Sequence, residues 1–384
     1  MFFFDTCIRA FVKGNLGDDL FIHVLCERYP NTHFWLCGEK KFRHCFSSLP
    51  NLSYVSVDSG LIKWLFRIIY ILPFSVNFLL RKLHRKNLFV KYTCFDFISR
   101  HSRHNVLISG SIFMEAPGHD FSMSPYYKKE QRYYKSEPYV IGCNFGPYHS
   151  LGYLEFYANC FKDATQVCFR DNYSFSLFNG NNIQVAPDIL FCYPSVAAIK
   201  PELKDYILIS VINLNKDGEN NSSVAQAYIE ALKKVIATLI SYEQNIVLMG
   251  FCRDQKDDAI ITQLQEFFSE YSRLYAVNYP DISCHEATGY LAGAKYIIAS
   301  RYHAMILGWL FGKKVFPISY NEKMQHVIED LAPDTFYITT DSLDTLNSTD
   351  IWEDILSSHN TFTDINSAVE NAFLHFSALD KILK

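Results

Sequence analysis

Short apolar runs alternate with segments of helical period along the whole chain. In the first half the apolar runs are FFFDTCIRA, HFWLCG, LSYVSV, NVLISG, PYVIGCN, TQVCFR and IQVAPDI, and the helical segment DDLFIHVLCERY follows the first of them. Strands that alternate with helices form parallel sheets, because each crossover helix returns the chain to the same end of the sheet. The pattern therefore predicts an α/β fold.

The same cycle restarts after the stretch 194–204. The strand YILISVINL is followed by the helix AQAYIEALKKVIATLI, and later strands are NIVLMG, LYAVNY, YIIAS and KVFPIS. A chain of 384 residues is longer than the roughly 250–300 residues at which a single core stops growing. We therefore predict two doubly wound Rossmann-like domains that face each other across a cleft, 1–197 and 198–384, the second ending in a C-terminal helix. Ligands of such folds bind at the carboxyl ends of the strands.

The helical segment that follows YIIAS begins in an unusual way. Ser300 is a good N-cap and Gly312 a good residue after the C-terminus, but Arg301 and His303 put cations where the helix dipole favours anions. A bound anion would make this arrangement favourable, since backbone N–H groups, a guanidinium and an imidazole could hold it together. The alternative is an Arg301 that extends into solvent and a His303 that is hydrogen-bonded in the core.

Polar residues also follow the strands of the first half. KGNLGDDL lacks the G-x-G-x-x-G pattern, and its carboxylates Asp18 and Asp19 would repel a pyrophosphate. They suit sugar hydroxyls or a general base, although Asp18 is equally well explained as an N-cap. Ser111 in ISGS and Asn144 in IGCNFGPY could line a ligand site, but such turns need Gly and Pro in any case. Arg170 in CFRDNYS ends a strand, where it could bind an anion or form a surface ion pair.

The order of these segments is more specific than any one of them. GNLGDD, ISGS, GCNFGP, FRDNYS, APD, SRYHA and PISYNEK together resemble the polysaccharide pyruvyl transferase family from Ala10 to about Asp330. The resemblance implies two Rossmann-like domains in a GT-B-like arrangement and the transfer of pyruvate from phosphoenolpyruvate to a sugar as a ketal. It also implies that Arg170, Arg301 and His303 are the donor-binding and catalytic cations. One departure concerns the acceptor contacts, because SGS at 109–111 stands where the family commonly has a run of glycines.

Phosphoenolpyruvate carries a carboxylate and a phosphate, so its site needs concentrated positive charge and forked donors. We expect His303 to be the acid that protonates the donor methylene carbon, or else a ligand of the phosphate. The helix N-terminus lowers the pKa of an imidazole, whereas a bound phosphate raises it. The expected donor-binding residues are Arg170, Ser300, Arg301, His303, Tyr320 and Lys323. The expected acceptor-binding residues are Asn15, Asp18, Asp19, Ser111 and Asn144.

Composition narrows the class of protein. Lys and Arg number 36 against 40 Asp and Glu, a formal net charge of -4, which argues against a dedicated nucleic-acid binder. The 11 cysteines never form C-x-x-C, so we expect reduced thiols, no metal, and no cofactor besides phosphoenolpyruvate as co-substrate. MFFFDTCIRA has neither the basic region nor the cleavage site of a signal peptide, which predicts a cytoplasmic protein.

The segment from Ser59 to Phe95 differs from the rest of the chain. It has no acidic residue, and apolar runs separate its cations, which are Lys63, Arg67, Arg81, Lys82, Arg85, Lys86 and Lys91. A spanning helix needs about 20 apolar residues, and the charges and Pro73 leave too short a run. The segment is either an amphipathic element on an anionic leaflet, where a lipid-linked glycan acceptor would lie, or an insertion packed on the first domain.

Two other functions fit parts of the pattern. A GT-B glycosyltransferase that uses a nucleotide sugar would need the same basic helix N-terminus for its diphosphate. A non-catalytic scaffold would have no use for Arg170, Arg301 and His303 as uncompensated cations in a cleft.

Overall fold

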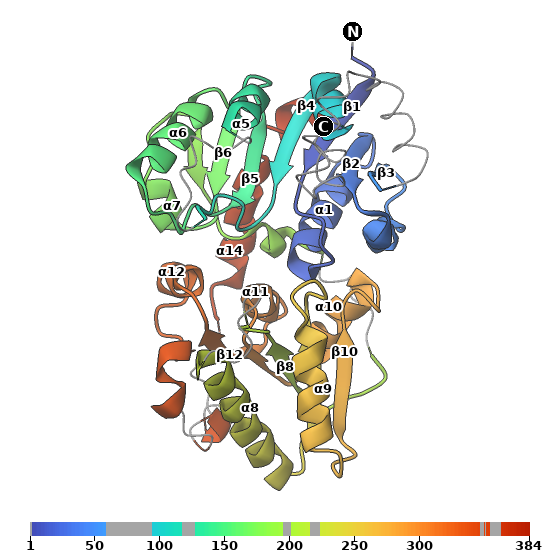
Figure 1. Cartoon of the computed structure of the whole chain (residues 1–384), viewed down its shortest axis with the longest axis vertical. Helices are drawn as coiled ribbons and strands as arrows, with labels where there is room; N and C mark the ends of the chain where they lie inside the picture. Colours follow the sequence, from blue (N-terminus) through green and yellow to red (C-terminus); the bar gives the residue numbers. More distant parts are fainter. Residues whose placement is uncertain are drawn as a thin grey trace, which may run out of the picture.

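The computed structural model describes residues 2–58, 94–116, 127–194, 201–215, 223–345, 349, 351–353 and 362–384. These residues form two parallel sheets with helices on their faces, one above the other in Figure 1. The predicted α/β class with two doubly wound halves is confirmed. Most of the basic segment lies outside the described residues, which resume at Cys94.

The first sheet has seven parallel strands in the order β3-β2-β1-β4-β5-β6-β7. Its strands are β1 (Phe4–Arg9), β2 (Phe34–Gly38), β3 (Leu52–Ser56), β4 (Ser102–Ile108), β5 (Tyr139–Cys143), β6 (Gln166–Phe169) and β7 (Ile183–Val185). Its helices are α1 (Leu16–Arg28), η1 (Lys40–Phe46), α5 (Tyr127–Tyr134), α6 (Leu151–Lys162), α7 (Asn172–Ser176) and η3 (Ile189–Cys192). The strand order reverses between β1 and β4, and a ligand crevice opens at such a point.

The second sheet repeats this topology with six strands in the order β10-β9-β8-β11-β12-β13. Its strands are β8 (Tyr206–Val211), β9 (Asn245–Gly250), β10 (Leu274–Asn278), β11 (Tyr296–Ala299), β12 (Lys314–Ser319) and β13 (Ile338–Thr339). Its helices are α8 (Ser223–Ser241), α9 (Asp257–Phe267), α10 (Cys284–Gly293), α11 (Tyr302–Leu310), α12 (Glu322–Leu331) and η5 (Thr340–Thr345). Here the reversal falls between β8 and β11. Every residue of these two strands is buried, because helices cover both faces of the sheet.

The last described residues return to the first sheet. They form α14 (Ile365–Ala372), η6 (Phe373–Phe376) and α15 (Asp380–Leu383). The Gln166 side chain donates to the carbonyls of Leu374 and His375, and Arg28 pairs with Asp380 at 2.6 Å. The sequence pattern assigns this C-terminal helix to the second domain, whereas its polar partners lie on α1 and β6 in the first half of the chain.

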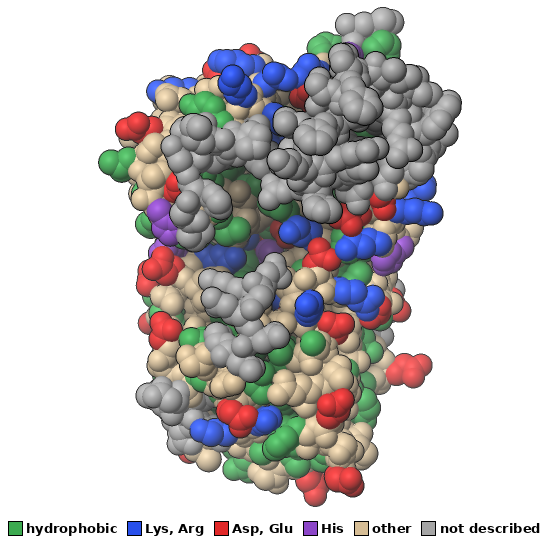
Figure 2. Space-filling view, in the orientation of Figure 1, with side chains coloured by type: hydrophobic (Ala, Val, Ile, Leu, Met, Phe, Trp, Pro, Cys, Tyr) green, Lys and Arg blue, Asp and Glu red, His purple; other side chains and the backbone are tan. Residues whose placement is uncertain are grey.

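The two halves pack directly against each other through the start of α1. The N–H of Leu16, at the start of α1, donates to the carbonyl of Phe251 at 3.0 Å, and helix α1 also packs on α10. Figure 2 shows a hollow between the halves in which Lys or Arg and His side chains are visible. No helix in the described part of the chain is long and apolar enough to cross a membrane.

Candidate functional site

Arg170 is the centre of a polar network at the carboxyl ends of both sheets. It follows β6 and is buried. Its Nη1 donates to Asp188 at 3.0 Å, and its Nη2 donates to the Oδ1 of Asn144 at 2.7 Å. The same Nη1 lies 3.4 Å from the Nε2 of His303, which belongs to the second half of the chain. The structure thus brings together two predicted cationic residues from different domains.

The network extends from Asn144, after β5, to Lys323 on α12 in the second half. Lys323 donates to the hydroxyl of Ser111 at 2.9 Å, and that hydroxyl donates to the Oδ1 of Asn144 at 3.0 Å. We call Lys323, Ser111, Asn144, Arg170 and His303 the central network. Each of its members follows a strand or opens a helix, so the doubly wound topology places all of them at one crevice.

Two glycines let this network pack closely. A Cβ on Gly17 would lie 1.7 Å from the Nδ1 of His303, and one on Gly110 would lie 3.0 Å from the Nη1 of Arg170. The N–H of Gly110 also donates to Asp18 at 3.4 Å, which places this carboxylate at the edge of the network. The motifs GNLGDD and ISGS therefore supply space for the side chains of His303 and Arg170.

Helix α11 begins one residue later than the sequence predicts. Its N-cap is Arg301, in an extended conformation and with no capping side-chain hydrogen bond. Ser300 is fully buried, and its N–H donates to the hydroxyl of Ser210 at 2.9 Å, so the prediction of Ser300 as N-cap is wrong. Gly312 follows the helix with φ +64, as predicted. The N-terminus of α11 thus has no capping side chain, and an uncapped helix N-terminus can bind an anion through its free N–H groups.

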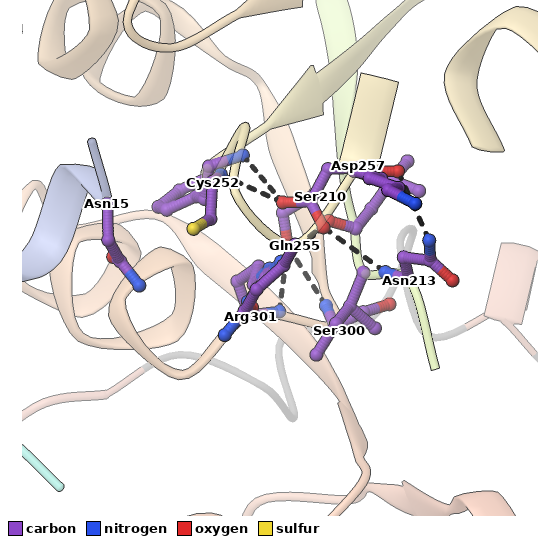
Figure 3. Close-up of polar contacts among 12 residues, drawn as sticks. Asn15, Ser210, Asn213, Cys252, Gln255, Asp257, Ser300 and Arg301 are labelled. Atoms are coloured by element: carbon purple, nitrogen blue, oxygen red, sulfur yellow. Dashed lines mark hydrogen bonds and ion pairs between the residues drawn. The ribbon is translucent and has the colours of Figure 1, made fainter. Parts of the chain in front are cut away.

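The guanidinium of Arg301 lies beside the central network but has partners of its own. It bonds to Asp257 and Gln255, which follow β9, and its Nε donates to the carbonyl of Val211 at 3.4 Å (Figure 3). Asp257 in turn accepts from the N–H groups of Phe251 at 3.0 Å and Cys252 at 2.9 Å. Arg301 and Asp257 together fix the loop between β9 and α9.

The two arginines are therefore not uncompensated, which corrects the sequence-based expectation. Arg170 pairs with Asp188 and Arg301 with Asp257, and all four side chains are buried. A buried guanidinium without a counterion would carry a penalty of several kcal/mol, so the chain supplies one for each. Lys323 is different, because no carboxylate among the described residues lies within ion-pair distance of its Nζ.

The electrostatic field at the crevice is positive. Burial lowers the pKa of His303 well below its usual range, and the charges of Arg170, Lys323 and Arg301 lower it further. Burial alone would raise the pKa of Tyr320, which follows β12, but the charges of Lys323 and Arg301 lower it instead. The unliganded site thus holds a neutral imidazole in a field that favours a bound anion.

Some of the predicted acceptor residues lie near Arg170 and others do not. Asp18, Ser111 and Asn144 adjoin Arg170. Asn15 instead caps α1, because its side chain accepts from the N–H of Gly17 at 3.1 Å; the interpretation of Asp18 as the N-cap is wrong. Asp19 is fully buried away from the network, where it accepts from the hydroxyl of Tyr279 at 2.7 Å and where burial raises its pKa to about 7.

Comparisons with known proteins agree on the family and the fold. The family model described as polysaccharide pyruvyl transferase matches residues 15–322. No curated protein matches the sequence.

Solved structures resemble the chain over nearly its whole length. One is the UDP-GlcNAc 2-epimerase of Methanocaldococcus jannaschii in complex with UDP-GlcNAc and UDP, with a TM-score of 0.56, 10% identity, and 98% of this chain and 99% of that chain covered. Another is the UDP-GlcNAc 2-epimerase of Neisseria meningitidis bound to UDP-GlcNAc, with a TM-score of 0.52, 8% identity, and coverage of 98% and 99%. A third is HepE of Anabaena in complex with UDP and glucose, with a TM-score of 0.51, 13% identity, and 98% of each chain covered. These likenesses show a GT-B fold.

Proposed function

The chain belongs to the polysaccharide pyruvyl transferase family, and from this premise we propose that it transfers pyruvate from phosphoenolpyruvate to a sugar of a surface polysaccharide or its lipid-linked precursor. The observation that carries the proposal is the central network. It holds a forked guanidinium, an ammonium with no carboxylate partner among the described residues and a neutral imidazole beside an uncapped helix N-terminus. A small ligand with both a phosphate and a carboxylate matches that set of donors.

In this mechanism the cations bind the donor and His303 supplies the proton. Arg170 and Lys323 hold the anionic groups, and the N-terminus of α11 faces the phosphate. The bound phosphate raises the pKa of His303, whose imidazolium then protonates the methylene carbon of the donor. One sugar hydroxyl attacks the resulting cationic carbon and a second displaces phosphate, which gives the pyruvate ketal with the protonated methylene carbon as its methyl group. One hydroxyl proton replaces the proton taken from His303, and the other passes through the carboxylate of Asp18 and leaves with the phosphate.

We assign the acceptor hydroxyl to Asp18. Its carboxylate is half-buried at the edge of the central network, and burial raises its pKa, although the N–H of Gly110 and the charge of Arg170 counteract this. A carboxylate of raised basicity beside the donor site accepts a hydroxyl proton more readily.

The direct test is incubation with phosphoenolpyruvate and candidate free or lipid-linked glycans. We expect release of inorganic phosphate and a glycan product whose mass has increased by one pyruvyl ketal. Phosphate release without a modified glycan, or no reaction with any acceptor, would contradict the proposal.

A glycosyltransferase that uses a nucleotide sugar is the second candidate. It is favoured by the fold, because the similar structures above were solved with UDP or UDP-GlcNAc. Thermal stabilisation by UDP but not by phosphoenolpyruvate would favour this candidate instead. A non-catalytic scaffold is a third. The counterions of Arg170 and Arg301 remove part of the argument against it, which now depends on Lys323 and the lowered pKa values of His303 and Tyr320.

Gly17→Ala should inactivate the protein without unfolding it. Alanine is the better helix former by about 1 kcal/mol, but its Cβ would overlap the ring of His303. A displaced reacting group of this kind lowers turnover roughly 10²-fold. Gly152→Ala is the matched control, because Gly152 also lies in the first turn of a helix and a Cβ added there would have no neighbouring atom within 4 Å. Equal turnover by the two variants would show that His303 needs no fixed position.

Arg301→Lys should lose most of the activity although the charge is kept. A single ammonium cannot bond to Asp257, Gln255 and the Val211 carbonyl at once, so the loop after β9 and the start of α11 shift. We expect turnover to fall on the order of tenfold or more. Arg273→Lys, at an exposed arginine, is the control. Unchanged turnover in Arg301→Lys would mean that activity does not need the several donor nitrogens of the guanidinium.

We also propose that the basic segment attaches the protein to the inner membrane face, where lipid-linked acceptors lie. Each cation near an anionic surface contributes about 1 kcal/mol. Replacing Arg81, Lys82, Arg85 and Lys86 by Gln should therefore weaken binding to anionic vesicles by several kcal/mol at most, and added salt should weaken wild-type binding in the same direction. Activity on a short free sugar should remain.

The control for this experiment removes the same charge elsewhere. It replaces four exposed cations by Gln, namely Lys40, Lys204, Lys234 and Arg273. Vesicle binding should survive this change. If the wild-type protein does not bind anionic vesicles at low salt, the proposal of membrane attachment is wrong and the alternative of a packed insertion is favoured.

A further inference from the structure

A second group of polar side chains lies at the interface between the two halves, apart from the central network. His23 and Glu27 are one turn apart on α1, and His285 is at the start of α10. One ligand atom from each of the three side chains lies within 4.8 Å of the other two. The sequence pattern predicts no metal, since no local spacing brings these residues together; only the packing of α1 on α10 does.

His23 directs one ring nitrogen toward this group. Burial would lower the pKa of His23, but Cys284 and Glu27 raise it to about 10, so a metal ion has to displace a proton from this nitrogen. Its Nε2 lies 3.0 Å from the carbonyl of Cys45, so the ring carries its proton there and donates it. Its Nδ1 is buried and lies 3.7 Å from the Oε1 of Glu27, at ion-pair distance. A metal-binding histidine usually donates its other ring N–H to a carboxylate, a backbone carbonyl or water, as Nε2 does here to the Cys45 carbonyl.

His285 is supported in the same way from the second half. Its Nδ1 lies 3.0 Å from the hydroxyl of Tyr193, which lies 3.1 Å from the hydroxyl of Thr288. When Nδ1 donates to Tyr193, Nε2 is left as the acceptor. The rings of His23 and His285 are 5.9 Å apart between centroids.

We propose that His23, Glu27 and His285 bind a divalent first-row metal ion, with Zn²⁺ the best match, and that this ion joins the two domains. Two imidazoles and one carboxylate form a common ligand set for zinc, and water completes the tetrahedron. Ligand atoms of a tetrahedral zinc site lie about 3.3 Å apart. The Nδ1 of His23 and the Oε1 of Glu27 are close to that separation at 3.7 Å, and the group as a whole, within 4.8 Å, contracts when it binds the ion. Zn²⁺ needs neutral imidazole and displaces any proton that His23 shares with Glu27. Glu27 is exposed and gives the ion access from solvent.

The test uses tag-free, full-length protein after treatment with a chelator. Titration with Co²⁺ should give one equivalent of binding with visible ligand-field absorption typical of a four-coordinate nitrogen and oxygen site, and Zn²⁺ should abolish that absorption. Zn²⁺ should also raise the melting temperature, because it binds only the folded protein. Glu27→Gln and His285→Gln, at accessible positions, should each weaken metal binding at least about tenfold.

His33→Gln is the matched control, since His33 is exposed and its ring bonds to the nearby Ser53. It should bind metal as the wild type does. The proposal is overturned if Co²⁺ gives no such absorption, or if Glu27→Gln and His285→Gln bind as tightly as the control. No substrate is present in these measurements, so the result is independent of the proposed transferase activity.

Discussion

His303→Gln should leave a folded protein that binds phosphoenolpyruvate but turns it over about 10²–10⁴-fold more slowly, the usual contribution of a positioned general acid. His303 lies against Gly17 and Phe21 and is only half-buried, so an amide of similar size should fit there. Glutamine can still donate to a phosphate oxygen but cannot release a proton to carbon. Isothermal titration with the donor and steady-state turnover, measured on one preparation, separate these two functions.

The pH dependence follows from the lowered pKa of His303. The imidazole is neutral in the free protein, and a bound dianion raises its pKa, so binding takes up a proton. Donor affinity should therefore be highest at low pH and should fall as pH rises through the pKa of the complex. In His303→Gln this part of the pH profile should be flat.

His101→Gln, on a partly exposed histidine far from the crevice, is the control and should behave like the wild type. If His303→Gln instead loses donor affinity as strongly as turnover, then His303 is a ligand of the phosphate and another group supplies the proton.

Much of the fold follows from the sequence because its signals are local. The apolar runs of strand length and the helical segments between them fix the parallel sheets. Ser111, Asn144 and Arg170 follow three adjacent parallel strands, so they lie at the same edge of the sheet. The sites of Arg301 and His303 could also be predicted, because cations at a helix N-terminus oppose the helix dipole and need an explanation.

The partners of these residues could not be predicted in the same way. Asp188 and Asp257 resemble ordinary loop carboxylates in the sequence, and only the tertiary fold places them against buried guanidinium groups. Asp18 and Asp19 are adjacent, yet successive residues of a helix point in different directions. One therefore adjoins the central network, and the other bonds to Tyr279.

Arg170→Lys should weaken donor binding more than any other single change in the crevice. The guanidinium bonds to Asp188 and Asn144, contacts His303, and lies 4.2 Å from the ring centroid of Tyr302. A lysine ammonium has one nitrogen and cannot reproduce that planar geometry. Loss of a forked, charge-assisted contact to the donor should raise its dissociation constant on the order of 10-fold to 100-fold.

Variants of Asp188 separate the effect of Arg170 on protein stability from its effect on donor binding. Removing one partner of a buried ion pair costs about 3–5 kcal/mol, so Arg170→Met should be less stable than Arg170→Lys. The double variant Arg170→Met, Asp188→Leu should recover stability, because no unpaired charge remains, but it should not recover donor binding. Thermal melts and donor titrations of the wild type, Arg170→Met, Asp188→Leu and the double variant form a double-mutant cycle. If the double variant bound the donor normally, Arg170 would serve only to neutralise Asp188, and the donor would have to be held by Lys323 and the N-terminus of α11.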